Sequence, residues 1–288
     1  MDWHAFCEIL ALAHLQPAPT VLTGGSIANT MKGLVSLGVP CALIGNVGLD
    51  ARGNEIINEL QRSGIEIYAT RTTTPTSHVI SLVTPDGERS FCAYIQAQKE
   101  TKEADLLPEY FESCELVHIE GYLLANQCVV EKAAQLAKAK GALVSFDVGN
   151  SVLAERYRER LWALLSEYVD IVFADIDEAC ALTHLPPDRA CALLGQLCPV
   201  AVVKMGADGC YVSSGGQQLH RPAIPTKVVD MTGAGDLFAA GFLCGYLQQA
   251  PLERCVLFGN LMWSAAVENY GGEIPLARIK EIITLLHQ

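Results

Sequence analysis

The stretch Asp230-Met-Thr-Gly-Ala-Gly-Asp-Leu-Phe238 leads directly into an apolar segment that is predicted to be a helix over 234–247. Its two glycines, Gly233 and Gly235, allow the backbone to turn tightly and to approach a ligand closely. The first amides of a helix have no partners within that helix and lie at its positive end, so this turn predicts an anion site. Asp236 lies in the first turn, where its carboxylate either caps the helix or accepts a proton.

Upstream of this turn, short apolar runs alternate with segments of helical spacing, which is typical of a mostly parallel sheet covered by helices. Strands are expected at 41–47, 116–119, 143–147, 171–174 and 200–204, and a late hairpin at 209–213 and 218–220. Helices are expected at 3–15, 54–63, 127–140, 153–167, 178–183, 234–247 and 254–269. We therefore predict a doubly wound α/β fold, with the whole chain, 1–288, as a single domain.

Residues 65–95 have a different sequence pattern, with short strand-like runs in which polar and apolar positions alternate. Pro85-Asp-Gly87 is a turn signal between the runs at 78–83 and 90–95, so these two runs are expected to form a hairpin. The alternation indicates that one face of this small β segment is exposed or covers something.

The composition is that of an acidic globular chain. It has 288 residues, of which 50% are hydrophobic, and its net charge is −12, so nucleic acid is not expected as a partner. The 11 cysteines are odd in number and irregularly spaced, which indicates reduced thiols. No apolar run reaches the ~20 residues that span a bilayer, and Asp2 and Glu8 stand where a signal peptide is basic. We expect a cytoplasmic protein without membrane association.

The 230–238 stretch resembles the C-terminal signature D-T-x-G-A-G-D-x-F of the PfkB, or ribokinase-like, carbohydrate and nucleoside kinases, with Met231 where Thr is usual. The resemblance implies a ribokinase-like fold and transfer of the γ-phosphate of ATP to a hydroxyl of a sugar or nucleoside, which Asp236 deprotonates. Four residues would supply the anion hole for the phosphoryl group: Gly233, Ala234, Gly235 and Asp236. Such catalysis rests mainly on positioning and charge stabilisation.

A second stretch, Gly24-Gly-Ser-Ile-Ala-Asn-Thr30, resembles the family's N-terminal signature. The resemblance implies that Gly24, Gly25 and Asn29 contact hydroxyls of the substrate. The pattern is not G-x-G-x-x-G, which disfavours a dinucleotide-binding oxidoreductase. Gly48-Leu-Asp-Ala-Arg-Gly53 resembles a further family motif, in which a purely structural turn role for Asp50 is as well supported as a functional one.

The nucleotide end of the predicted site rests on partial matches. Asp175-Ile-Asp-Glu178 resembles the family's N-x-x-E, whose Glu organises Mg²⁺ around the phosphates, so Asp175 and Glu178 are candidate metal residues. Capping of the next helix is the alternative. Candidate ATP contacts are Lys204, Gly206, Gly209, Thr232 and Asn260. The resemblance implies ATP and Mg²⁺ as cofactors, with a monovalent cation such as K⁺ as a further option near Asn260 and the Gly271-Gly272 turn.

Residues 65–95 correspond to the small β-lid of the family, which covers the substrate and mediates dimerisation, so a homodimer through this lid is expected. Family members begin with a strand that ends in a substrate-binding aspartate, whereas 3–15 is predicted to be a helix. We therefore expect that strand, its aspartate and part of the lid to be missing.

The N-terminal signature of this chain resembles the form found in a bacterial branch of the family that includes adenosine and sugar kinases. The resemblance to the family, taken together with the differences from its usual sequence pattern, leaves two hypotheses. The first is an active kinase, and the second is a degenerate relative that binds a nucleotide or a partner without turnover. Scattered histidines and the absence of G-x-S-x-G disfavour a zinc enzyme and a serine hydrolase.

Overall fold

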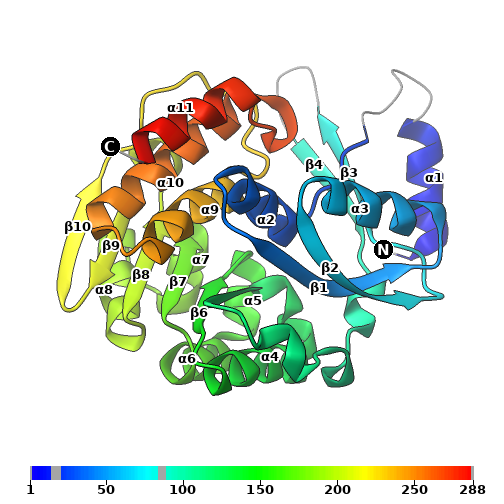
Figure 1. Cartoon of the computed structure of the whole chain (residues 1–288), viewed down its shortest axis with the longest axis horizontal. Coiled ribbons are helices and arrows are strands. Elements are labelled where there is room, and N and C mark those ends of the chain that lie inside the picture. Colours follow the sequence, from blue (N-terminus) through cyan, green and yellow to red (C-terminus); the bar gives the residue numbers. More distant parts are fainter. Residues whose placement is uncertain (1, 14–20, 84–88, 287–288) are drawn as a thin grey trace.

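The computed structural model describes residues 2–13, 21–83 and 89–286, and a six-stranded sheet lies at its centre (Figure 1). Its strands are β5 (Leu116–Glu120), β6 (Leu143–Asp147), β7 (Ile171–Asp175), β8 (Val200–Lys204), β9 (Cys210–Ser214) and β10 (Gln217–Arg221). The strand order is β10-β9-β8-β7-β6-β5. Strands β5 to β8 are parallel, and β9 and β10 form the antiparallel edge. The predicted parallel sheet and late hairpin are confirmed.

Successive residues of the inner strands point to opposite faces of this sheet, so each strand supplies two hydrophobic cores. Ile171 and Phe173 lie in one core, and Val172 and Ala174 lie in the other. The first core is covered by α2 (Ser26–Ser36), α9 (Ala234–Leu247), α10 (Leu252–Val267) and α11 (Leu276–Leu286). The second is covered by α4 (Gln127–Ala139), α5 (Ser151–Arg156), α6 (Arg158–Glu167), α7 (Ile176–Thr183) and α8 (Pro187–Leu197).

A second region precedes the large sheet in the chain. It contains α1 (Trp3–Ala13), β1 (Cys41–Gly48), α3 (Ala51–Arg62), β2 (Ile65–Thr72), β3 (His78–Val83) and β4 (Arg89–Tyr94). Strands β1 and β2 form a separate parallel sheet, and β3 and β4 form an antiparallel hairpin. The predicted hairpin is thus confirmed, while its turn at 85–87 lies outside the described residues.

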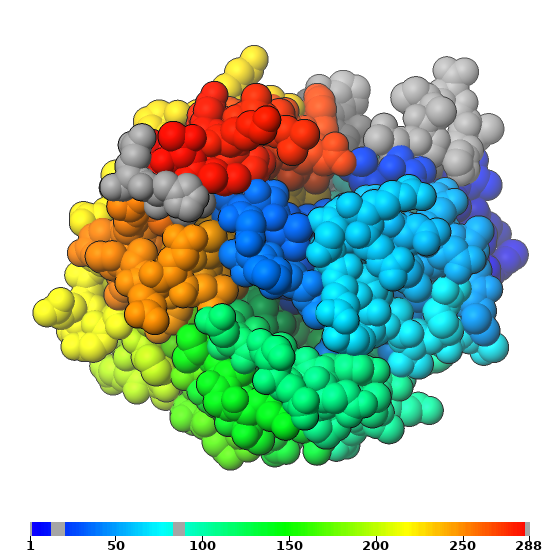
Figure 2. Space-filling model, in the orientation of Figure 1, coloured from blue at the N-terminus to red at the C-terminus, as the bar shows by residue number. Residues whose placement is uncertain are grey.

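The helix α1 packs on this hairpin, because the ring of Trp3 meets that of Tyr94 edge-on at 4.8 Å. Residues 2–13 and 21–40 contain no strand, so β1 is the first strand of the described chain. In the space-filling view, the surface of α2 (blue) lies between those of α9 and α10 (orange) and of α3 and β2 (light blue) (Figure 2). The helix α2 therefore joins the two regions.

Some element bounds differ from those predicted. The single helix expected at 153–167 is two helices, α5 and α6, because Tyr157 leaves the helical conformation at φ −109° and ψ 20°. Neither α8 nor α11 was predicted. Pro186 is the N-cap of α8 and Pro187 its first residue, a position where a helix accepts proline.

Short 3₁₀ helices complete the connections. They are η1 (Ala97–Glu100), η2 (Glu103–Asp105), η3 (Pro108–Phe111), η4 (Gly121–Asn126), η5 (Gly206–Asp208) and η6 (Tyr270–Gly272). Of the helices in the described residues, none is both long enough and apolar enough to cross a membrane.

Candidate active site

Charged residues end four neighbouring parallel strands at the same edge of the large sheet. Glu120 ends β5, Asp147 ends β6, Asp175 ends β7 and Lys204 ends β8. The strand register places Glu120 opposite Asp147, and Asp175 opposite Lys204. The carboxyl ends of parallel strands are where open α/β sheets bind their ligands, so this edge is the candidate site.

The predicted anion turn reaches the same edge from α9. Gly233 is the N-cap of α9 with φ 73°, a left-handed conformation that favours glycine. A Cβ built on Gly235 would lie 3.3 Å from Lys204 Nζ, which places the start of α9 against the end of β8. The amide of Ala234 donates to the carbonyl of Met231 at 3.2 Å, so this member of the predicted anion hole is already bonded within the turn.

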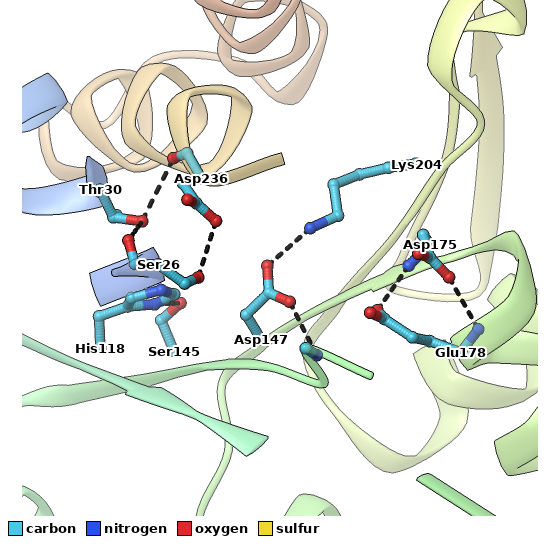
Figure 3. A network of polar contacts seen from close by, with 10 residues as sticks. Ser26, Thr30, His118, Ser145, Asp147, Asp175, Glu178, Lys204 and Asp236 are labelled. Atoms are coloured by element: carbon cyan, nitrogen blue, oxygen red, sulfur yellow. Dashed lines mark hydrogen bonds and ion pairs between the residues drawn. The ribbon is translucent and has the colours of Figure 1, made fainter. Parts of the chain in front are cut away.

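Both carboxylate oxygens of Asp236 are held by α2. Ser26 Oγ donates to Oδ1 at 2.7 Å, and Asn29 Nδ2 donates to Oδ2 at 2.8 Å. Figure 3 also shows Thr30, whose hydroxyl donates to the backbone oxygen of Asp236 at 3.3 Å. Burial raises the pKa of Asp236 and outweighs the two donors, so this carboxylate is more basic than an exposed aspartate. Asn29, predicted to contact substrate, therefore also orients the predicted base.

Lys204 and Asp147 form a buried ion pair across β7, with Nζ 2.6 Å from Oδ2 (Figure 3). Their side chains are 15% and 8% exposed. Burial lowers the pKa of Lys204, but the carboxylates of Asp147 and Glu178 outweigh it and hold that pKa above its usual value. The predicted ATP contact Lys204 is thus a buried cation beside the start of α9.

Asp175 and Glu178 cap α7 reciprocally. Asp175 Oδ1 accepts from the amide of Glu178 at 2.8 Å, and Glu178 Oε2 accepts from the amide of Asp175 at 2.8 Å. Helix capping was the alternative that the sequence left open, and both side chains take part in it. Burial, together with nearby Asp147, raises the pKa of Glu178 to about 8, so this carboxyl is mostly protonated at neutral pH.

The fit of this edge to Mg²⁺ depends on how that ion is bound in proteins. Among the described residues, no three His, Cys, Asp or Glu side chains converge closely enough to bind a metal ion. Mg²⁺ is usually bound by one or two carboxylates together with water and substrate phosphates. Glu178, a buried acid, and Asp175, which ends β7 beside it, supply two carboxyl groups of that kind at this edge. The donor set therefore fits Mg²⁺ that arrives with a nucleotide.

Known proteins resemble this chain over nearly its whole length. The sequence model described as pfkB family carbohydrate kinase matches residues 1–278. The chain belongs to the PfkB family. Its relatives include carbohydrate and nucleoside kinases, which are transferases that phosphorylate hydroxyl groups.

Three relatives illustrate the match of this PfkB chain. The adenosine kinase from Sinorhizobium meliloti is 32% identical with a TM-score of 0.89, over 98% of this chain and 88% of that chain. A putative ribokinase II from E. coli, in complex with ATP and Mg²⁺, is 27% identical with a TM-score of 0.81, over 94% of each chain. An uncharacterized sugar kinase from Archaeoglobus fulgidus is 26% identical over 256 residues, 85% of this chain and 98% of the relative. The predicted ribokinase-like fold is confirmed.

Two of the four other predicted nucleotide residues of the PfkB chain, Gly206 and Thr232, lie around the turn before α9. Gly206, in η5, approaches the side chain of Met231. The carboxylate of Asp230 accepts from the amide of Thr232 at 2.7 Å and from the amide of Gly271 at 2.8 Å. These contacts join the 230–233 turn to η5 and to the Gly271-Gly272 turn.

Gly209 and Asn260 make structural contacts farther along the same connections. The amide of Met205 donates to the carbonyl of Gly209 at 2.7 Å and closes η5. Asn260 is buried in α10, and its Nδ2 donates to the carbonyl of Pro222 at 3.1 Å. Neither contact requires a nucleotide.

Gly24 and Gly25 lead into α2 on the other side of Asp236. Gly25 is the N-cap of α2 with φ 108°, and no atom lies within 4 Å of a Cβ built on either glycine. The loop therefore borders open space, and the next residue, Ser26, reaches Asp236. Asp50 has a structural contact instead, because its side chain caps α3 by accepting from the amide of Gly53 at 2.7 Å.

Several residues of the site were missed by sequence reasoning. Glu120 is 7% exposed, and its Oε1 has no hydrogen-bond partner among the described residues. Burial raises the pKa of Glu120 to about 8 and lowers the pKa of the adjacent His118 to about 4. Asp147 was missed as well. Glu120 directly follows one predicted apolar strand and Asp147 ends another, where a charge is unexpected, and this signal could have identified them. For Ser26, the only such signal in the sequence was its position directly after Gly24-Gly25.

Proposed function

We propose that this PfkB chain is an ATP-dependent kinase that transfers the γ-phosphoryl group to a hydroxyl of a nucleoside or a simple sugar, with Asp236 as general base. The observation that carries the proposal is the placement of Asp236. Its carboxylate is held by Ser26 and Asn29, and it lies in the first turn of α9, beside Lys204. Phosphoryl transfer needs a group that accepts the proton of the attacking hydroxyl and positive charge that stabilises the transferred phosphoryl group. The carboxylate of Asp236 can accept the proton, and the start of α9 and the ammonium of Lys204 supply the positive charge.

In this proposal, Asp236 accepts the proton of the acceptor hydroxyl as that oxygen attacks the phosphoryl group. The turn Gly233–Asp236 and the ammonium of Lys204 stabilise the negative charge on the phosphoryl oxygens. The open loop at Gly24 and Gly25, with Asn29, binds further hydroxyls of the acceptor. Glu120 adds a buried oxygen without a hydrogen-bond partner among the described residues, and an acceptor hydroxyl would supply one.

The nucleotide would lie along the ends of β7 and β8 and over the turn before α9. Gly206, Gly209, Thr232 and Asn260 belong to the segments that would border it. Glu178, with Asp175 beside it, would hold Mg²⁺, which when bound neutralises charge on the phosphates. A K⁺ site near Asn260 and the Gly271-Gly272 turn is part of the same proposal.

Adenosine is the first acceptor to test, because the adenosine kinase from Sinorhizobium meliloti is 32% identical to this chain. ADP release would be followed with adenosine, other nucleosides, ribose and fructose in the presence of MgATP. We expect one acceptor class to raise ADP release well above the rate without acceptor. No stimulation by any of them would refute the kinase proposal and favour a relative that binds without turnover.

We further propose that 65–95 is a lid within a single domain, 1–288, and that two copies pair through it in the cytoplasm. Val79 and Phe91 lie on one face of the β3–β4 hairpin and are 57% and 59% exposed. Burying such a face against a second copy removes apolar surface from water. Light scattering tests this: Phe91→Ser should give a monomer, while Leu276→Ser, at an exposed position on α11, should leave a dimer. A monomeric parent protein would contradict it.

A further inference from the structure

The carboxylate of Asp147 is fixed at both oxygens. Oδ1 accepts from the amide of Gly149 at 3.1 Å, and Oδ2 accepts from Lys204 Nζ at 2.6 Å (Figure 3). Gly149 has φ 79°, a left-handed conformation that favours glycine at this turn. The short turn after β6 therefore aims Asp147 in one direction, toward Lys204.

The position of Lys204 is electrostatically unusual. Its Nζ lies 3.3 Å from a Cβ built on Gly235, at the start of α9. A helix start carries a partial positive charge, so a buried ammonium beside it is unfavourable unless an anion lies nearby. Asp147 supplies that negative charge before a nucleotide arrives. Lys204 can therefore stay next to the point where an incoming phosphoryl group meets the helix start.

Other carboxylates compete for Lys204. Asp236 on α9 attracts the ammonium, and so does Glu178 on α7 in its ionised form, though Asp147 on β6 alone of the three is hydrogen-bonded to it. Without Asp147, the ammonium would move toward these two acids. A closer Lys204 would compete for the carboxylate of Asp236 and reduce its capacity to accept a proton.

We propose that Asp147 is a positioning residue, which holds the Lys204 ammonium at the start of α9 for contact with the γ-phosphoryl group and keeps it away from Asp236. This role rests on the proposed kinase function. It assigns to Asp147 no contact with the substrate or with the phosphates, and it makes the effect of Asp147 depend entirely on Lys204.

Calorimetric titration tests this role without any acceptor. The affinities for Mg-ADP and for the non-hydrolysable ATP analogue Mg-AMP-PNP would be measured for the parent protein, Asp147→Asn, Lys204→Met and the double variant. The ratio of the two affinities reports the contact with the γ-phosphoryl group. We expect Lys204→Met and Asp147→Asn each to reduce the AMP-PNP preference roughly tenfold, as for loss of one charged hydrogen bond. The double variant should be no worse than Lys204→Met alone.

A second ion pair offers a matched control. Lys138 pairs with Asp170, whose carboxylate also accepts from a backbone amide, that of Val144. Asp170 directly precedes β7 and therefore lies at the opposite end of that strand from the candidate site. Asp170→Asn makes the same chemical change in a similar pair, so it should affect thermal stability and leave the nucleotide preference unchanged.

Turnover provides the second readout. Asp147→Asn should lower kcat with little change in KM for the acceptor, and Asp147→Glu should restore part of the loss because it keeps the charge. Additive effects of Asp147→Asn and Lys204→Met, or an unchanged AMP-PNP preference in a folded Asp147→Asn protein, would overturn the positioning role. Failure of the parent protein to bind either nucleotide would instead refute the kinase proposal itself.

Discussion

Ser26 and Asp236 are 210 positions apart in the chain, yet the hydroxyl of Ser26 donates to Oδ1 of Asp236 at 2.7 Å. The contact forms because α2 packs against α9 in the first hydrophobic core, where Leu34 and Phe238 are both buried. The helix that follows the Gly24-Gly25 loop therefore determines which way the carboxylate of Asp236 points.

Replacing Asp236 by Asn should remove the base and preserve the shape of the site. We expect kcat to fall roughly 10²–10⁴-fold, the range for loss of a general base, while the affinity for Mg-AMP-PNP stays within a small factor of the parent value. Steady-state kinetics with the best acceptor and calorimetric titration would measure the two quantities. Asp188→Asn, an exposed change in the first turn of α8, is the control, and it should leave both unchanged. Near-normal turnover of Asp236→Asn would disprove the assigned role.

Removing the hydroxyl of Ser26 should change the pH dependence of the reaction. The donors Ser26 and Asn29 lower the pKa of Asp236 against the larger effect of burial, so Ser26→Ala should raise this pKa further. A base works only when ionised, so activity is lost as pH falls through its pKa, and the acid limb of the kcat profile should move to higher pH. We also expect kcat at the optimum to fall roughly tenfold, as for loss of one hydrogen bond to a charged group.

Thr30→Val is the matched control for that experiment. Thr30 is buried on the same helix, but its hydroxyl contacts the backbone oxygen of Asp236 and not the carboxylate. The acid limb of Thr30→Val should therefore coincide with that of the parent protein. If the Ser26→Ala profile also coincides with it, the hydroxyl of Ser26 does not tune the base.

The turn before α9 was predictable from sequence because its residues are adjacent in the chain. Gly233, Gly235 and Asp236 lie within one turn, and the apolar helix follows them at once. The pairing of Lys204 with Asp147 is different, since 57 positions separate them and their contact depends on the order of β6, β7 and β8. Hydrophobic periodicity predicts which face of a strand is buried, but it does not predict which strands become neighbours.

The same limit explains the residues of α2. The contact of Asn29 with Asp236 arises only when α2 packs on α9, and the sequence alone does not show that packing. The two roles left open for Asp175 and Glu178 needed coordinates as well, because a capping box and a metal site use the same acids at the same spacing.

Binding of a magnesium nucleotide should release protons from Glu178. In the structure, burial raises the pKa of Glu178 to about 8, so the carboxyl is mostly protonated at pH 7. A nearby dication favours the charged form and lowers this pKa, so binding at pH 7 should release up to one proton per site. Calorimetry in buffers of different ionisation enthalpy measures this release. Glu178→Gln retains an acceptor for the amide of Asp175, and should abolish the release; equal release from both proteins would exclude Glu178 as its source.

Asp50 should contribute to stability without affecting catalysis. Its carboxylate accepts from the amides of Gly53 and Thr76 and from the hydroxyl of Thr76, which connects α3 to the segment before β3. We expect Asp50→Ala to lower the free energy of unfolding by about 1–2 kcal/mol, as for loss of a helix cap. Urea denaturation measures this, and Asp188→Ala, exposed in the first turn of α8, should change it little.

The pH dependence of stability provides a second test of Asp50. Burial raises its pKa, but the donors from Thr76 and Gly53 outweigh burial and hold that pKa below its usual value. The stabilisation should therefore be complete above the unfolded pKa of about 4 and decline as pH falls through the lower folded value. The stability difference between the parent protein and Asp50→Ala should shrink in acid; a constant difference would contradict this assignment.

One helix, α2, follows the Gly24-Gly25 loop, proposed to bind the acceptor, and also holds the carboxylate of Asp236. In the proposed function, substitutions at Gly24, Gly25 or their neighbours that select a new acceptor should therefore also change the catalytic rate. The β3–β4 hairpin belongs to a separate sheet. Libraries that aim to broaden the acceptor range should therefore diversify this hairpin and leave the first turn of α2 unchanged.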